Sequence, residues 1–201
     1  MKIITTPAAG TALDLTKTKL FCRVTDNAED ALITQLMGAA ETACERYTNR
    51  SLRAQTVQLF LNSLPTGGVV DLFEQVLAVY SDGPDVELPK GYVSAVAHVK
   101  VHGEDGSETT LEGNGVDYIL SIGGQERNIV KFLTPLPVVL RAVDAIEIQY
   151  TAGVATVPED ITLGMMQCVA YWYENRDMAG TLLRTTRGLW NSYRVIPVGR
   201  R

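Results

Sequence analysis

Residues 145–176 read AIEIQYTAGVATVPEDITLGMMQCVAYWYENR. Apolar and polar side chains alternate over residues 145–151, which is the period of a strand. After Pro158, which suits the first turn of a helix, apolar residues recur at helical spacing to Arg176. A strand followed by a helix predicts that this chain contains both sheet and helix.

The helix predicted after Pro158 is apolar around much of its circumference. Its main stripe is widened by Leu163, Met166 and Ala170. A helix of this kind needs partners on more than one side. We therefore expect it to pack against other helices and to retain surface for further contacts.

Two more helices are predicted on the N-terminal side, over residues 14–22 and from about Asp26 to Arg50. Asp26 is a candidate N-cap, since Glu29 follows three residues later. From about residue 54 the apolar period changes to 2. The resulting antiparallel meander has strands at residues 54–62, 93–101, 116–121, 127–133 and 145–151. The strand over 93–101 is expected to place its odd-numbered residues on the apolar face: Val93, Ala95, Ala97, Val99 and Val101.

This order of elements predicts an α+β fold. It is a small helical bundle built from N- and C-terminal helices, with an inserted antiparallel β module. The predicted divisions are a helical core of residues 1–53 and 152–187, a β module of residues 54–151, and a C-terminal docking tail of residues 188–201. Residues 65–89 show no clear period and receive no assignment.

The charge of the chain is unevenly distributed. Residues 1–175 hold 12 basic and 22 acidic side chains, a balance of −10, whereas residues 176–201 hold six arginines and one aspartate, a balance of +5. No apolar run is long enough for a membrane span, and no secretory signal is visible, so a cytoplasmic chain with no membrane partner is predicted. The three cysteines are expected to be buried free thiols.

No catalytic or metal-binding motif is present. His98 and His102 would lie about 13 Å apart on one face of a strand, too far to hold a single ion, so they are interpreted as solvated or subunit-boundary residues. Phosphate-binding loops and nucleophile elbows are missing. We therefore predict a protein that is not an enzyme and has no cofactor, although a small hydrolase whose residues converge only in three dimensions is one alternative.

A second alternative is a nucleic-acid-binding module. It would use the aromatic run Tyr171-Trp-Tyr173 and the arginines of the tail, since both can stack on or neutralise a nucleic acid. The position of the aromatic residues on an apolar helix favours packing instead. The acidic body also argues against strong general DNA binding.

Several segments, in their order along the chain, resemble the head-tail connector family, also called adaptor or head-completion proteins, of long-tailed bacteriophages and gene transfer agents. They are Lys19–Val24, Asp30–Leu36, Ala43–Arg50, Ile148–Gly153, Val157–Ile161, Ala170–Arg176 and Tyr193–Val195. The segment at residues 65–89 departs from the commoner pattern of this family.

This resemblance implies a structural virion neck protein that is assembled in the host cytoplasm. Its copies would form a ring, usually dodecameric, that joins the portal to the tail and extends the DNA channel. The expected partners are the portal protein, other copies of the chain, and a tail terminator or neck (stopper) protein. DNA would pass through the lumen without sequence-specific binding.

Two sets of contact residues are predicted on this basis. Apolar and aromatic anchors combined with arginines suit docking onto the portal. The candidate portal-binding residues are Leu189, Trp190, Tyr193, Arg194, Val195, Ile196, Arg200 and Arg201. The candidate subunit-interface residues are Met166, Tyr171, Tyr173 and Arg176. Deleting residues 188–201 is expected to abolish portal binding and leave the fold intact.

Overall fold

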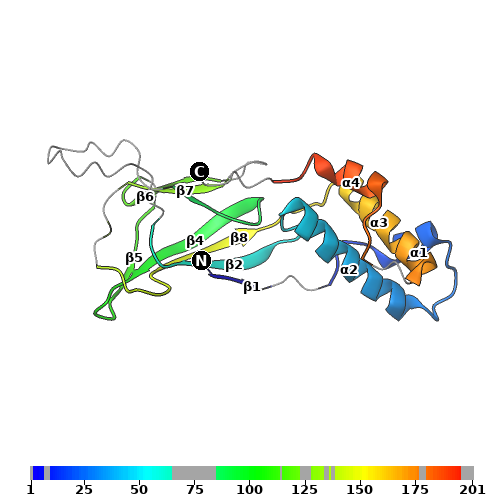
Figure 1. Cartoon of the computed structure of the whole chain (residues 1–201), viewed down its shortest axis with the longest axis horizontal. Helices are drawn as coiled ribbons and strands as arrows, with labels where there is room; N and C mark the ends of the chain where they lie inside the picture. The colour runs from blue at the N-terminus through cyan, green and yellow to red at the C-terminus, as the bar shows by residue number, and fades with distance from the viewer. Residues whose placement is uncertain are drawn as a thin grey trace. The chain divides into compact units, whose positions relative to one another are not determined.

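A computed structural model describes residues 2–6, 10–64, 85–113, 115–122, 128–133, 136, 139–176 and 180–195. The chain divides into two compact units. One contains Met1–Pro7 and Gln55–Ala152, and the other contains Ala8–Ala54 and Gly153–Arg201. The first unit holds the strands and the second the helices, which confirms the predicted α+β class (Figure 1).

The helical unit contains four described helices: α1 (Leu15–Cys22), α2 (Asp30–Thr48), α3 (Glu159–Glu174) and α4 (Arg184–Asn191). Helix α3 is central, because it packs against each of the other three. This arrangement confirms that the apolar helix after Pro158 has several neighbours. None of the described helices is long and apolar enough to cross a membrane.

The core of the helical unit is apolar and is contributed by all the longer helices. Its buried members are Leu13, Ile33, Met37, Ala40, Cys44, Leu52, Ile161, Met165, Cys168, Val169, Trp172 and Trp190. At about 25 cal/mol per Å² of apolar surface removed from water, a core of this kind is the main source of stability for the unit.

An aspartate precedes each of the two N-terminal helices, but only one of the two caps its helix. Asp14 caps α1, because its Oδ1 accepts a hydrogen bond from the backbone N–H of Lys17 at 2.8 Å. Asp26 was predicted to cap the next helix, and this is wrong. Its Oδ1 accepts from the backbone N–H of Ala28 at 2.9 Å and stabilises a turn, so that α2 begins at Asp30.

The sheet unit contains eight described strands, all paired antiparallel. They are β1 (Lys2–Thr6), β2 (Gln55–Leu61), β3 (Asp85–Glu87), β4 (Val93–His102), β5 (Glu108–Thr110), β6 (Tyr118–Ser121), β7 (Ile129–Phe132) and β8 (Ile146–Ala152). The larger sheet has the order β1-β2-β8-β4-β5, and the smaller has the order β3-β7-β6. An antiparallel module is thus confirmed, but the simple meander is wrong, since β8 pairs between β2 and β4.

Two predicted divisions change. Residues 2–6 form β1 and pair with β2, so they belong to the sheet unit and not to the helical core of residues 1–53. The described part of the docking tail, residues 188–195, belongs to the helical unit. The unassigned segment of residues 65–89 contributes the short strand β3, and residues 65–84 lie outside the described parts of the chain.

Strand β4 departs from the expected alternation. Val93, Val99 and Val101 are buried as predicted, but Ala95 and Ala97 are exposed. The pairing of β4 with β8 shifts between Val93 and Ala95 and again near His98. Each shift inserts a residue and turns the following side chains to the other face of the sheet.

Gly153 lies where β8 has ended and the chain enters the helical unit. Its φ is +127°, and a Cβ atom there would be 2.1 Å from the carbonyl oxygen of Arg53. Only glycine fits this position, because the backbone conformation and the close approach both exclude a side chain.

Candidate assembly interface

The indole of Trp190 is buried within its own subunit. It lies beside Gly164 of α3, where an added Cβ would be 2.4 Å from the indole Nε1. The same nitrogen donates a hydrogen bond to the carbonyl oxygen of Ile161 at 3.3 Å. Trp190 was predicted to be a portal-binding anchor, but it is fully buried in the helical core and presents no surface to a partner.

The residues after α4 are fastened to the other helices by three hydrogen bonds. The hydroxyl of Tyr193 donates to the carboxylate of Asp160, with its oxygen 2.8 Å from Oδ2. Arg50 Nε donates to the carbonyl oxygen of Tyr193 at 2.5 Å. The backbone N–H of Val195 donates to the carbonyl oxygen of Thr48 at 2.9 Å. We call residues 190–195 with these contacts the C-terminal clamp.

The other candidate portal-binding residues have different positions. Leu189, Tyr193 and Val195 are half-buried, and Arg194 is exposed with its guanidinium 5.4 Å above the ring of Tyr47. Ile196, Arg200 and Arg201 lie outside the described residues. Leu189, Tyr193, Arg194 and Val195 are therefore brought together at one end of the helical unit, and their portal contact stays a prediction.

The candidate subunit-interface residues lie between the middle of α3 and the residues just after it. Met166, Tyr171 and Tyr173 are half-buried against the helical core, and Arg176 is exposed. The Tyr173 hydroxyl donates a hydrogen bond to Glu29, and Arg176 forms an ion pair with the same carboxylate at 3.2 Å. The bond to Glu29, together with burial, raises the pKa of Tyr173.

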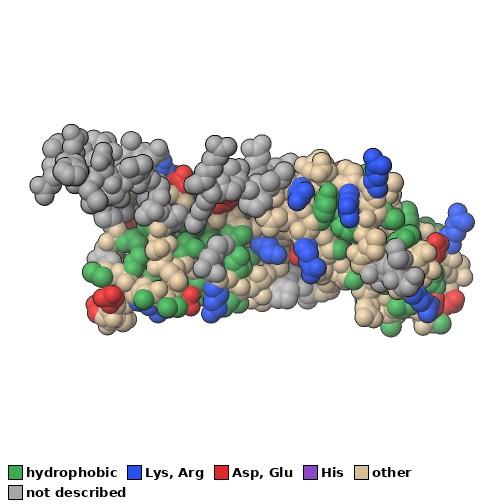
Figure 2. Space-filling view, in the orientation of Figure 1, with side chains coloured by type: hydrophobic (Ala, Val, Ile, Leu, Met, Phe, Trp, Pro, Cys, Tyr) green, Lys and Arg blue, Asp and Glu red, His purple; other side chains and the backbone are tan. Residues whose placement is uncertain are grey.

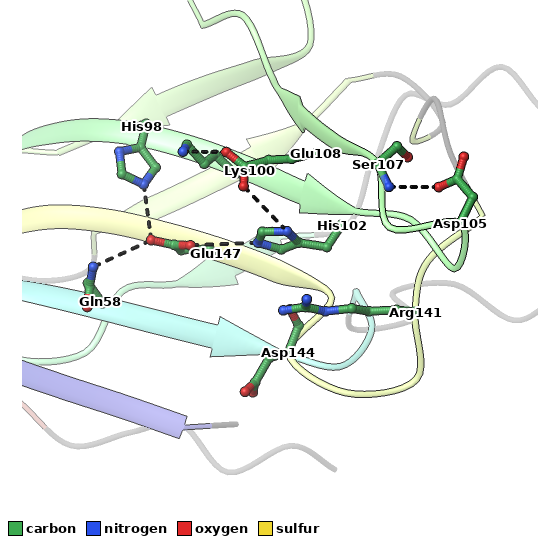
Figure 3. Close-up of polar contacts among 10 residues, drawn as sticks. All are labelled: Gln58, His98, Lys100, His102, Asp105, Ser107, Glu108, Arg141, Asp144 and Glu147. Atoms are coloured by element: carbon green, nitrogen blue, oxygen red, sulfur yellow. Dashed lines mark hydrogen bonds and ion pairs between the residues drawn. The ribbon is translucent and has the colours of Figure 1, made fainter.

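A polar cluster lies on one face of the larger sheet (Figure 3). Glu147 of β8 lies between two histidines of the neighbouring strand β4. Its Oε1 is 3.2 Å from Nε2 of His98, and its Oε2 is 3.7 Å from Nε2 of His102. Glu108 is 3.9 Å from His102 and 2.5 Å from Lys100. Sequence reasoning treated the histidines alone and missed the carboxylate between them, whose cross-strand position depends on the pairing of β4 with β8.

The cluster is held together by contacts between charged and polar side chains, and its described residues do not form a recognisable catalytic arrangement. No group of three or more His, Cys, Asp or Glu side chains suited to a metal ion occurs among the described residues. The three thiols are free, with Cys44 and Cys168 buried and Cys22 half-buried. Burial raises the pKa of the Cys168 thiol to about 11, so it is a poor nucleophile near neutral pH.

The outward face of α4 is basic. Arg184 and Arg187 are exposed on it, together with Gly188 and Asn191. In Figure 2, basic side chains gather on the part of the helical unit that α4 occupies in Figure 1. The opposite face carries Trp190, so α4 is held to the core by one side and exposes arginine on the other.

Solved structures with the same fold come from gene transfer agent (GTA) particles. A chain from the neck of an empty GTA particle, computed with C6 symmetry, has a TM-score of 0.75 and 23% identity, over 98% of this chain and 97% of that one. A chain from the virion of a native GTA particle has a TM-score of 0.76 and 22% identity over the same shares. A chain from the neck of a native GTA particle, computed with C12 symmetry, has a TM-score of 0.72 and 21% identity, again over these shares.

The fold is therefore one that occurs among the structural subunits of virion-like particles. The sequence pattern of the phage gp6-like head-tail connector proteins matches residues 12–121, more than half of the chain. The chain belongs to this family of head-tail connector proteins. The comparison with curated proteins gives no match.

Proposed function

We propose that this chain is a structural protein of the virion neck, whose copies form a dodecameric ring between the portal and the tail. The ring extends the DNA channel, and DNA passes through it without sequence-specific binding. The particle is a long-tailed phage or a gene transfer agent, and the ring is assembled in the host cytoplasm.

One observation carries this proposal. The chain belongs to the head-tail connector family, and over nearly its whole length it shares its fold with a chain from a particle neck. Two of the matched necks were computed with C6 and C12 symmetry, which supports a ring of repeated subunits. In a cyclic ring each subunit uses two different patches, one for each neighbour. The role is architectural and needs no catalytic group.

The portal contact is proposed to use the surface side chains at the C-terminal end of the chain. Leu189, Tyr193 and Val195 supply apolar surface next to the positive charge of Arg194. Ile196, Arg200 and Arg201 are included on their sequence alone. Trp190 is removed from this set because it is buried.

The contact between neighbouring subunits is proposed to include the C-terminal end of α3. Met166, Tyr171 and Tyr173 each keep part of their surface exposed, and Arg176 is largely exposed. Large half-buried side chains beside an arginine are typical of the centre of a protein interface. The opposite face of the ring is left for the next neck component, a tail terminator or stopper protein.

Mixing the purified protein with the portal of the same particle tests the proposal. Electron microscopy is expected to show a second ring of twelve subunits stacked on the portal, with a continuous central channel. A protein that binds no portal would contradict the proposal. So would tight, steeply salt-dependent binding to duplex DNA by the isolated protein, which would favour a nucleic-acid-binding module.

A further inference from the structure

The outward face of α4 carries arginine charges that no other described residue neutralises. Arg184 and Arg187 are exposed, and neither forms an ion pair with another described residue. The described residues 180–195 contain three arginines and no acidic residue. We call Arg184 and Arg187 the basic surface.

Arg184 is placed against the electrostatics of its own helix. It is the first residue of α4, and that helix has no acidic residue in its first turn and no basic residue in its last. The N-terminal end of a helix carries partial positive charge, so an arginine there is unfavourable within the isolated subunit. A local rule broken in this way, with no acidic partner for Arg184 in the part of the chain that the structure describes, points to a contact outside the subunit.

Gly188 adds a second observation on the same face. It lies inside α4, and a Cβ atom placed there would meet nothing within 4 Å. Packing within the subunit therefore does not require glycine, although glycine lowers helix stability relative to alanine. A helix face without a side chain at its middle lets another backbone approach closely between the arginines.

The sheet unit has an acidic surface, opposite in charge to the basic surface. It lies in the hairpin that joins β4 to β5 and in residues 111–112, which follow β5. Glu104, Asp105 and Glu112 are exposed and form no ion pair with another described residue. Hydrogen bonds from Ser107 hold the Asp105 carboxylate and lower its pKa, so it stays ionised (Figure 3). Residues 103–113 contain four acidic residues and no basic one.

We propose that the basic surface of one subunit binds the acidic β4–β5 hairpin of a second copy of this chain. The inference rests on the proposed ring, which requires two different surfaces on each subunit. Arg184 and Arg187 then face the carboxylates of Glu104, Asp105 and Glu112, and the contact repeats around the ring without self-repulsion. Charge pairing of this type fixes register and partner choice more than it adds affinity.

A second copy is favoured over DNA as the occupant because of the charge of the chain. A duplex approaching the basic surface would also meet a body with a balance of −10 over residues 1–175, which repels phosphate. The acidic surface of a neighbouring subunit has no such conflict, and the ring brings it close at high local concentration.

A charge exchange tests the contact on the full chain bound to its portal. Arg184→Glu with Arg187→Glu is expected to raise the protein concentration needed to complete the ring by about tenfold. Glu104→Lys with Glu112→Lys should do the same. Combining all four changes should restore most of the assembly, because the charges again face opposite charges. All four side chains are exposed, so circular dichroism melting should stay close to that of the wild type.

The matched control is Lys17→Glu, compared with the single change Arg187→Glu. Lys17 is exposed on α1, and the described residues of α1 do not pack against α4. Lys17→Glu changes the net charge by the same amount as Arg187→Glu. It is expected to leave assembly unchanged. Raising the salt from about 50 to about 500 mM should weaken the wild-type ring and the exchanged ring alike.

Each result decides the inference. The proposed contact is contradicted if the arginine variant assembles normally, or if the combination of all four changes does not restore assembly. Either result leaves the proposed neck function unaffected. Loss of duplex DNA binding by the arginine variants, with normal rings, would assign the basic surface to nucleic acid. A wild-type chain that forms no ring on the portal would defeat the proposed function itself, and this inference with it.

Discussion

Gly153 has a backbone conformation that other residues rarely adopt, and it also touches the backbone of a distant segment. Its φ of +127° and the 2.1 Å approach of a Cβ to the oxygen of Arg53 act together. The sequence shows only a Gly after a strand, which is compatible with any turn. The contact across one hundred residues could not be predicted from it.

Replacing Gly153 by alanine is expected to lower the free energy of unfolding by about 3 kcal/mol or more, because the backbone of residues 53–54 must move. Urea denaturation measures this. The control is Gly180→Ala, since Gly180 has a φ of +93° but no atom within 4 Å of its Cβ. It isolates the smaller conformational cost, and equal losses at the two positions would contradict the steric explanation.

The hydrogen bond between Tyr193 and Asp160 is expected to stabilise the C-terminal clamp. Tyr193→Phe removes the hydroxyl and leaves the carboxylate without this donor, so stability should fall by about 1–2 kcal/mol. Thermal melting and limited proteolysis after α4 measure the effect. Tyr171→Phe is the comparison, because the Tyr171 hydroxyl has no hydrogen bond to another described residue; similar losses in both variants would argue against the clamp.

The buried thiol of Cys168 predicts a loss of stability at alkaline pH. Burial raises its pKa from 9.0 to about 11 in the folded chain. The unfolded thiol therefore ionises first, and stability is complete below about pH 9 and falls by about 2 kcal/mol as the pH rises to about 11. Urea midpoints measured from pH 8 to 11 should fall less steeply for Cys168→Ala. An unchanged slope would show that Cys168 does not contribute.

At the scale of elements, long periodic segments were the predictable ones. The stripes of α2 and α3 and the alternation in β2 and β8 are continuous enough to identify each element from the sequence. Strands β1, β3 and β5 were missed because none of them shows a clear alternation of apolar and polar residues. Their pairing partners, and not their own sequence pattern, decide their structure.

The packing of α4 and of the residues after it was harder to predict from the sequence than the presence of the longer helices. Trp190 of α4 was predicted to be a surface anchor, and it is buried instead. Its burial depends on Gly164, which leaves room on α3. Aromatic residues fill cores and interfaces equally well, so composition alone could not separate the two roles.

The buried indole changes what a deletion in this element should do. Removing residues 188–201 takes away Trp190 and the clamp, so the helical unit is expected to lose about 3–5 kcal/mol, as for Trp190→Ala. The burial of Trp190 thus predicts that this deletion destabilises the fold, in contrast to the prediction from the sequence. Calorimetry of both variants tests this, and a deletion variant as stable as the wild type would show that the indole is dispensable.

At the scale of the whole molecule, the family and the α+β class could be predicted from the sequence, whereas the two charged surfaces proposed to pair could not. Ordered short motifs identify the family because they are spread over the chain. The basic surface and the acidic hairpin become visible only when exposure and ion pairing are known residue by residue. The same holds for the carboxylate of Glu147 between two histidines.

A shorter deletion separates folding from portal binding. Removing residues 196–201 leaves the clamp in place, so melting is expected to match that of the wild type. Portal binding should fall strongly, since Ile196, Arg200 and Arg201 are among the proposed contacts. Co-sedimentation with the portal measures this. Unchanged binding would place the portal contact on Leu189, Tyr193, Arg194 and Val195 alone.

The order of the strands also bears on how the protein is made. Strand β8 lies between β2 and β4, and α3 is the centre of the helical unit, yet both come from residues 146–174. Neither core can close until the ribosome has delivered this late part of the chain. The residues synthesised before this part must then keep their apolar surface exposed to solvent. Folding is expected to be slow, because it depends on contacts between residues far apart in sequence. The folded subunit therefore arises only after residues 146–174 have been synthesised.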